Sequence, residues 1–535
     1  MRNFGSFDFI VVGAGSAGCV LANRLTESGR YRVLLLEAGG RDLNPWIHVP
    51  LGYGKLFLDD RVNWKYYTEP EPGLNGRKIF QPRGRVLGGS SSINGLVYIR
   101  GQREDFDAWR DAGNIGWGYD DVLPYFRKSE DQARGADAFH GAGGPQSVSD
   151  QREPHELCDA FITAAQQAGF ARNPDFNGAS QEGAGYFQTT SRHGRRCSTA
   201  VAYLNPAKRR GNLKIVTGAQ VRRVLFEGRC ATGVEWLADG AVMQARASGE
   251  IILSAGAINT PQLLQLSGVG PGALLQGLGV EVVQDNPGVG ENMQDHLQVR
   301  CVFRCTRPIT FNDDMLHWYR RLWAGLRYLT LRKGPLTVSA GYAGGFFRTD
   351  QSLSRPDIQV HFINFSTGKM GDGLDPYSGF TASSCQLQPE SRGWVRAVSP
   401  DIAAPPAIFA NYLGTERDQA ANIAGIRLLR RIMAQTAMQP YLAAEVAPGA
   451  RVQSNDEILY YARGTGSTIY HPTCSARMGC DASAAVDPAL RVRGAERLRV
   501  ADGSVMPNVV SGNTNAAIIM IGEKAADLIL NAARP

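Results

Sequence analysis

A glycine-rich turn near the amino terminus restricts the possible folds of this chain more than any other segment. The β-branched run from Phe9 to Val12 leads into the turn Gly13-Ala14-Gly15-Ser16-Ala17-Gly18, and a helical pattern follows. A second apolar run, Val33 to Leu36, then ends at Glu37. Strand, glycine turn, helix and strand form a βαβ unit of about 30 residues, whose strands must be parallel. We therefore predict an α/β, Rossmann-like domain.

The same turn predicts a dinucleotide site. Glycines at positions 13, 15 and 18 allow a pyrophosphate to approach the N-terminus of the helix, where free N–H groups favour anions. Glu37, 19 residues after Gly18, can bind both hydroxyls of an adenosine ribose. A carboxylate repels a 2′-phosphate, so the sequence favours FAD or NAD over NADP.

Composition excludes several classes of protein. The 535 residues carry 57 Lys and Arg against 50 Asp and Glu, a net charge of +7 that is too small for a nucleic-acid-binding protein of this size. With 43 % hydrophobic and 20 % charged residues, the chain is an ordinary globular protein of two to four domains by a rough prior of about 150 residues each. Its nine cysteines show no repeated CxxC spacing, so we expect neither a disulfide framework nor a metal site.

The order of the patterns predicts two domains, the first of them discontinuous. Short strand patterns return between Leu213 and Val283, and a final helical pattern runs from Asn515 to about Ala532. Between them lie a long amphipathic helix, Asp418 to Ala434, and strand-like runs such as Asp357 to Phe362. We predict a cofactor-binding domain of residues 1–155, 213–296 and 462–535, and a substrate-binding domain of residues 156–212 and 297–461.

The apolar segments are too short for a membrane span. The longest runs, such as those from Ile251 and Ala516, have far fewer than the roughly 20 residues that cross a bilayer. No basic, signal-like segment precedes the first strand pattern. We expect a cytoplasmic protein without a transmembrane segment, and peripheral association with the inner membrane stays open.

Four longer motifs resemble one enzyme family. They are GRVLGGSSSINGLVYIRG from Gly84, GAINTPQLLQLSGVG from Gly256, HPTCSARMG from His471 and SGNTNAAIIMIGEKAAD from Ser511. In this order they resemble the glucose-methanol-choline (GMC) family of FAD oxidoreductases over nearly the whole chain. The resemblance implies FAD and a substrate-binding domain built on an antiparallel sheet flanked by helices, so the fold is α+β overall. Some members bind flavin covalently through a histidine, and Ile93 occupies that position here, so we expect noncovalent FAD.

The resemblance also implies a set of residues around the cofactor. The last helix is expected to direct its positive N-terminus at the flavin, where it would stabilise the anionic reduced form. The expected cofactor-binding residues are Gly13, Gly15, Ser16, Ala17, Gly18, Glu37, Ala38, Arg85, Gly88, Gly89, Ser90, Asn94, Gly95, Val221, Ala255, Ala501, Asp502, Asn515 and Ala516.

His471 matches the catalytic histidine of the family. Histidine suits proton transfer near neutral pH, and we expect the other seven histidines to be structural or exposed. Asn515 stands where the family carries a second histidine or an asparagine. Asparagine cannot act as a base, so its expected role is to donate a hydrogen bond to the forming alkoxide. Cys474 is interpreted as a small buried residue rather than a nucleophile.

The expected reaction is oxidation of a primary alcohol to the aldehyde by hydride transfer to flavin N5. Three segments, Asn173 to Gly185, Arg195 to Ala200 and Tyr470 to Cys474, look most like the branch with sorbose dehydrogenase, so L-sorbose or a related polyol is the first expected substrate. Choline, polyethylene glycol and aliphatic alcohols are the alternatives, and a quinone is the expected electron acceptor. A non-redox lyase of the family, a non-catalytic flavoprotein and a nicotinamide dehydrogenase are the other classes considered. The oligomeric state is left open.

Overall fold

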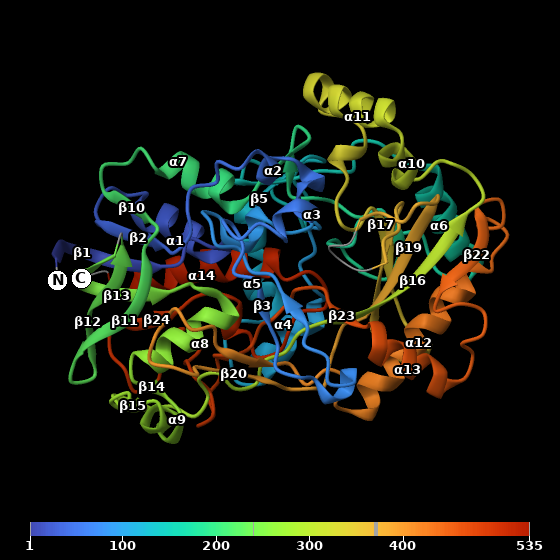
Figure 1. Cartoon of the computed structure of the whole chain (residues 1–535). Coiled ribbons are helices and arrows are strands. Elements are labelled where there is room, and N and C mark those ends of the chain that lie inside the picture. Colours follow the sequence, from blue (N-terminus) through green and yellow to red (C-terminus); the bar gives the residue numbers. More distant parts are fainter. Residues whose placement is uncertain (1, 239, 369–372, 534–535) are drawn as a thin grey trace.

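A mixed sheet forms the first half of the molecule, at the left of Figure 1. The structure, a computed structural model, describes residues 2–238, 240–368 and 373–533. The strand order is β10-β2-β1-β13-β12-β11, and β24 also pairs with β13. Strands β10, β2, β1, β13 and β24 run parallel, whereas β13, β12 and β11 pair antiparallel. Their bounds are β10 Leu213–Thr217, β2 Val33–Glu37, β1 Arg2–Val12, β13 Ala241–Leu253, β12 Cys230–Ala238, β11 Gln220–Glu227 and β24 Leu498–Val500.

Helices from opposite ends of the chain pack together on this sheet. Helix α1 (Ser16–Thr26) begins directly after the glycine turn, and α14 (Asn515–Ala532) lies against it. A Cβ at Gly522 would lie 3.1 Å from the Cα of Ala17, so a glycine allows this close approach. Most residues of α14 are buried, which makes it a core helix. The first expected helix and the last one are therefore confirmed, and they meet in one core.

The second half is an antiparallel sheet, at the right of Figure 1. The strand order is β22-β16-β19-β18-β17-β7, with β23 also paired to β16, and every pair is antiparallel. Helices α6 and α12 pack on this sheet, and α13 lies beside α12. The bounds are β22 Leu442–Ala447, β16 Leu297–Cys305, β19 Gly379–Gln386, β18 Ile358–Ile363, β17 Ala343–Phe347, β7 Gly183–Tyr186, β23 Ser467–Thr468, α6 Glu156–Gln167, α12 Glu416–Met433 and α13 Asn455–Thr465.

Among the remaining helices, α5 packs against α14, and both α4 and α5 contribute buried side chains to the first core. No helix in the described ranges is both long and apolar enough to cross a membrane. The bounds of the remaining helices are α2 Pro45–His48, α3 Tyr53–Leu56, α4 Arg103–Asp111, α5 Tyr119–Ser129, α7 Asn205–Ala207, α8 Gly256–Leu266, α9 Gly272–Gly277, α10 Phe311–Leu316 and α11 Trp318–Leu331. Two-stranded ribbons complete the fold: β3 Tyr66–Tyr67 with β4 Phe80–Gln81, β5 Glu130–Gln132 with β6 Gln146–Val148, β8 Ser191–Arg192 with β9 Arg195–Arg196, β14 Val269–Gly270 with β15 Gln284–Asp285, and β20 Trp394–Arg396 with β21 Ala407–Phe409.

Two short segments pack differently from the predicted domain boundaries, which otherwise stay a prediction. The helical turn 200–204 lies in the first core, because the Tyr203 hydroxyl donates to Glu523 of α14 at 2.9 Å. Conversely, β23 belongs to the second sheet, although residues 462–535 were expected in the first domain.

Candidate active site

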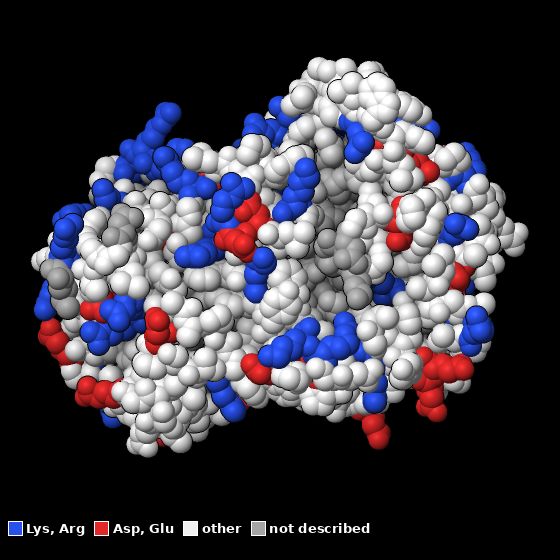
Figure 2. Space-filling model, viewed as in Figure 1, with Lys and Arg blue, Asp and Glu red and all other residues white. Residues whose placement is uncertain are grey.

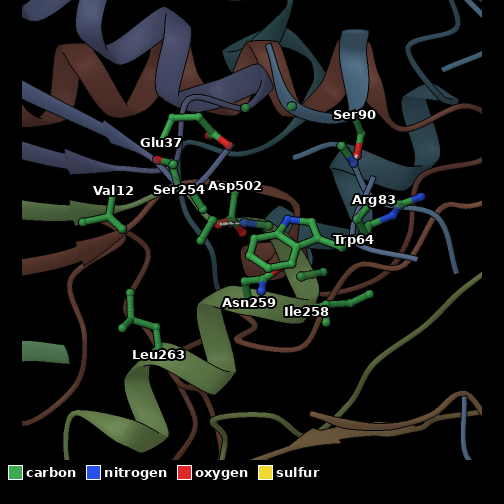
Figure 3. A pocket seen from close by; sticks show the side chains of 18 of the residues that line it. Val12, Glu37, Trp64, Arg83, Ser90, Ser254, Ile258, Asn259, Leu263 and Asp502 are labelled. Atoms are coloured by element: carbon green, nitrogen blue, oxygen red, sulfur yellow. Dashed lines mark hydrogen bonds between the residues drawn. The ribbon is translucent and has the colours of Figure 1, made fainter. Parts of the chain in front are cut away.

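The glycine turn and Glu37 form one end of a long pocket. Glu37 ends β2, and its carboxylate accepts hydrogen bonds from the N–H groups of Ala14 at 2.9 Å and Gly39 at 2.8 Å. Burial raises the pKa of Glu37 to about 7, and these two N–H groups oppose the shift. A carboxylate has about four acceptor positions, so two remain for further donors. Figure 3 shows Glu37 on one side of the pocket, Ser90 and Arg83 on the other, and Trp64 between them.

Close backbone contacts give this end its shape. A Cβ at Gly18 would overlap the carbonyl oxygen of Gly13, and a Cβ at Gly89 would lie 2.7 Å from the Cα of Gly15. Helix α1 has no side-chain cap and no acidic residue in its first turn, so its first N–H groups are left for a ligand. The turn therefore directs the backbone N–H groups at the start of α1 toward the pocket, and its close backbone contacts require glycines.

Asp502 organises the middle of the pocket. Its carboxylate accepts from the Gly256 N–H at 2.8 Å and the Thr260 hydroxyl at 2.6 Å, both at the start of α8. It also accepts from the Ser504 N–H at 2.8 Å. Trp64, which the sequence did not assign to this site, stacks on Tyr66 at 5.8 Å between ring centroids and adds an aromatic wall.

Most of the cofactor-binding residues expected from the sequence line this pocket. Those lining it are Gly13, Gly15, Ser16, Ala17, Glu37, Ala38, Gly89, Ser90, Val221, Ala255 and Asp502. Three others, Asn94, Gly95 and Asn515, line the adjoining pocket described next. The structure places Gly18, Arg85, Gly88, Ala501 and Ala516 in neither lining, although the Arg85 guanidinium lies over the ring of Trp64 at 4.6 Å.

A second pocket adjoins the first, and the two share Ser16, Arg83, Ser90 and Ile518 in their linings. It lies between the glycine-rich segment 90–97 and the second sheet, with His471 in its wall. Much of the wall is apolar, formed by Tyr53, Phe57, Ile93, Leu96, Val97, Ile363, Phe365 and Ile469.

A chain of hydrogen bonds assigns the tautomer of His471. His296 Nε2 lies 3.0 Å from the carbonyl oxygen of Leu387, so this nitrogen carries the proton and donates it. His296 Nδ1 then accepts from His471 Nδ1 at 3.0 Å, which leaves His471 Nε2 unprotonated. Asn513 Nδ2, 3.3 Å away, donates to that nitrogen. Burial, with the nearby His296, His361 and Arg83, lowers the pKa of His471 well below its usual value, so the imidazole is neutral at pH 7.

Asp295 holds both histidines in place. Its Oδ1 accepts from the backbone N–H groups of His296 and His471, each at 2.8 Å. Its Oδ2 accepts from the side chains of Gln81 at 3.0 Å, Tyr412 at 2.5 Å and Thr468 at 2.6 Å. The carboxylate is thus a buried acceptor for five donors, four of them from segments far away in the sequence.

The structure departs from the sequence-based expectation at the second active-site position. Asn515, expected beside the substrate oxygen, accepts a hydrogen bond from the Ser16 hydroxyl at 2.7 Å, and Asn513 contacts His471 instead. His296 and His361, expected to be merely structural or exposed, lie beside His471, and His361 lines the same pocket. The adjacent acid and histidine at positions 295 and 296 were the only sequence signal for this cluster of histidines. Cys474 is buried, and burial raises the pKa of its thiol to about 12, so it is a poor nucleophile.

Comparison with known proteins finds relatives that match nearly the whole chain. Family models described as GMC oxidoreductase match residues 7–298 and 389–522. The chain is 45 % identical over 532 residues to mitochondrial choline dehydrogenase of Mus musculus, covering 98 % of this chain and 89 % of the relative. It is 44 % identical over 529 residues to alcohol dehydrogenase [acceptor] of Pseudomonas putida, covering 98 % and 96 %.

Solved structures show the same fold. Pyridoxine 4-oxidase from Mesorbium loti superposes with a TM-score of 0.88 at 31 % identity, covering 97 % of this chain and 98 % of the other. A formate oxidase variant from Aspergillus oryzae, studied for its FAD modification, superposes with a TM-score of 0.91 at 27 % identity, covering 100 % and 99 %.

Proposed function

This chain belongs to the GMC oxidoreductase family and is an FAD-dependent oxidoreductase of alcohols, and we propose that it converts a primary alcohol without a positive charge to the aldehyde. The observation that carries the proposal is the pocket beside His471, which is largely apolar and contains arginines.

The first pocket fits FAD. We propose that the first N–H groups of α1 bind the pyrophosphate and that the free acceptor positions of Glu37 bind ribose hydroxyls. Ser90 and the α14 N-terminus lie where the two pockets meet, so they would border the flavin. When bound, FAD supplies the acceptor for the hydride that leaves the alcohol carbon. Ile93 cannot form a covalent bond to it, and we expect acid precipitation to release all of the flavin.

We propose His471 as the base. Its Nε2 is unprotonated in the assigned tautomer and faces Asn513. This nitrogen takes the proton of the alcohol hydroxyl, and Asn513 Nδ2 donates a hydrogen bond to the oxygen as it gains negative charge. We assign this second role to Asn513 in place of Asn515.

The charge of the pocket sets the substrate class. Arg300 of β16 lines it and donates to the carbonyl oxygen of Thr367 at 3.1 Å, and no ion pair joins it to any described residue. Burial lowers the pKa of Arg300, yet a guanidinium remains charged at pH 7. None of the described residues that line the pocket is Asp or Glu. At an effective dielectric constant of about 20, two like charges about 8 Å apart repel by about 2 kcal/mol, roughly a 30-fold effect.

Choline is the second candidate, because relatives at 43–45 % identity are named choline dehydrogenases. A quaternary ammonium is favoured by a carboxylate or aromatic faces. Tyr53, Phe57 and Phe365 offer faces, but Arg300 opposes the charge. L-sorbose, the first substrate expected from the sequence, would need several polar partners, and the relatives named above do not favour it.

Anaerobic flavin reduction tests the proposal. We expect a medium-chain 1-alkanol to bleach the bound flavin with a rate constant per concentration at least tenfold above those of choline and L-sorbose. Arg300→Leu should lower the ratio of the alkanol rate constant to the choline rate constant about tenfold. Arg304 is exposed on the same strand, and Arg304→Leu should leave this ratio unchanged. Faster reduction by choline in the wild type would reject the substrate class. His471→Ala should slow reduction by at least about 10²-fold with every alcohol.

We also propose a quinone as the electron acceptor. Reoxidation of the reduced enzyme should be faster with a soluble quinone than with dissolved oxygen at equal concentration. Stopped-flow recovery of the flavin absorbance measures both rates.

A further inference from the structure

Helix α11 turns its apolar face away from the protein. Seven of its apolar side chains are 48–69 % exposed: Leu331 at its last position, and the six residues Trp318, Tyr319, Leu322, Trp323, Leu326 and Leu329. At 100° per residue these six occupy a single arc of the helix, which we term the outer face. The opposite side buries Ala324 and Tyr328. In Figure 1, α11 projects at the top of the molecule. A large apolar patch exposed in this way is typical of an interaction site.

The helix is held in this orientation by polar contacts on its inner side. The Tyr328 hydroxyl donates to the carbonyl oxygen of His48 at 3.3 Å, and Arg327 forms an ion pair with Glu153 at 2.8 Å. These anchors direct the outer face toward solvent, and no described part of the chain covers it.

The charges around the outer face identify its partner. The segment 318–333 contains five basic residues and no acidic one. Arg321 and Lys333 are exposed, and Figure 2 shows this projection as mostly uncharged surface with basic side chains beside it. A second copy of the helix would bring like charges together. An anionic lipid surface would pair with them instead, and Trp and Tyr are the residues that favour the boundary between headgroups and acyl chains.

We propose that α11 binds the protein to the surface of an anionic phospholipid bilayer. Fourteen residues at about 1.5 Å each give roughly 21 Å, shorter than the roughly 30 Å hydrocarbon core, so the helix lies in the interface and does not span it. The outer face enters the acyl boundary, and Arg321 and Lys333 contact the headgroups.

Docking brings elements of the substrate pocket close to the lipid. Ala340, nine residues after the end of α11, lines this pocket. On the inner side, α11 contacts the α2 segment that leads into Tyr53, another lining residue. This part of the proposal rests on the proposed function, because an apolar alcohol concentrates in the bilayer.

Vesicle flotation of the flavin-loaded enzyme tests the proposal. We expect it to float with vesicles of phosphatidylglycerol and phosphatidylcholine, and at least tenfold less with phosphatidylcholine alone. Trp318→Ser/Leu322→Ser/Leu329→Ser should reduce binding to the anionic vesicles at least tenfold. The matched variant Leu43→Ser/Ile115→Ser/Tyr460→Ser removes side chains that are 74–78 % exposed elsewhere and should bind like the wild type.

Two further measurements keep the outcome clear. Arg321→Glu/Lys333→Glu keeps the outer face and should lose binding to the anionic vesicles only. All variants should keep full flavin content and the rate with a water-soluble alcohol, which separates this proposal from the assigned chemistry. Wild type that stays out of the lipid fraction, whether as a monomer or as a dimer that the α11 variant dissociates, would overturn the proposal. Equal flotation of the α11 and matched variants would also overturn it.

Discussion

Removing the carboxylate of Asp295 should both destabilise and inactivate the enzyme. Asp295→Ala deletes the acceptor of five buried donors, two of them the backbone N–H groups of His296 and His471. A buried donor left without an acceptor costs about 1–3 kcal/mol, so five cost roughly 5 kcal/mol or more. Since whole proteins are stable by about 5–15 kcal/mol, the variant should lose a large part of its stability.

Asp295→Asn should be milder because its amide keeps one oxygen. The Tyr412 and Thr468 hydroxyls can rotate to accept from the new NH₂ group. This leaves mainly one N–H of the Gln81 amide without an acceptor, because Gln81 Nε2 also donates to the Tyr412 hydroxyl at 2.8 Å. We expect a loss of about 1–3 kcal/mol, one unsatisfied donor.

Urea unfolding of the flavin-loaded enzyme, followed by flavin fluorescence and circular dichroism, measures these losses. The rate of flavin reduction in the folded fraction measures the position of His471. Asp120→Ala, which removes an exposed ion pair with Arg103, should change neither. If Asp295→Ala unfolds within 1 kcal/mol of the wild type and reduces flavin at the same rate, the assigned role of Asp295 is refuted.

Three other predictions concern the two pockets. Because burial lowers the pKa of His471, the base stays unprotonated on mild acidification. The value of kcat/KM should therefore remain constant from pH 8 to 6.5 and decline only at lower pH. A decline centred near pH 7 would contradict this prediction. Asn513→Ala should slow flavin reduction by about 10²-fold, the effect of one lost donor to the developing oxyanion, and Asn515→Ala should slow it less; the reverse order in stopped-flow experiments would restore the sequence-based assignment. Gly18→Ala should abolish most FAD binding because its methyl group overlaps the Gly13 carbonyl, whereas Gly277→Ala, with open space around it, should keep a full flavin content by absorbance.

The sequence predicted those parts of the fold and site that depend on local pattern. The glycine turn and Glu37 lie within one βαβ unit, so their spacing alone brought them together. The positions of the two asparagines are harder to predict, because α14 begins at Asn515. Asn515 contacts Ser16, whereas Asn513, before the helix, lies beside His471.

The network around Asp295 was not predictable from spacing. Its donors Gln81 and Tyr412 are more than a hundred residues away on either side, and only the tertiary fold brings them to one carboxylate. Likewise, the outward-facing apolar side of α11 was not predicted, since an apolar stripe on a helix ordinarily faces a core.

The pairing of α1 with α14 has a consequence for biosynthesis. Ser16 and Asn515 are 499 residues apart, as are Arg24 and Glu523, which join the same two helices through an ion pair at 2.8 Å. At about 5–20 residues per second, a ribosome needs roughly half a minute or more between these segments. During that time, the apolar side of α1 lacks its partner, and the flavin site cannot close. The nascent chain therefore exposes this apolar side until translation reaches α14, and the pocket that Ile518 lines is complete only after the last helix has been made.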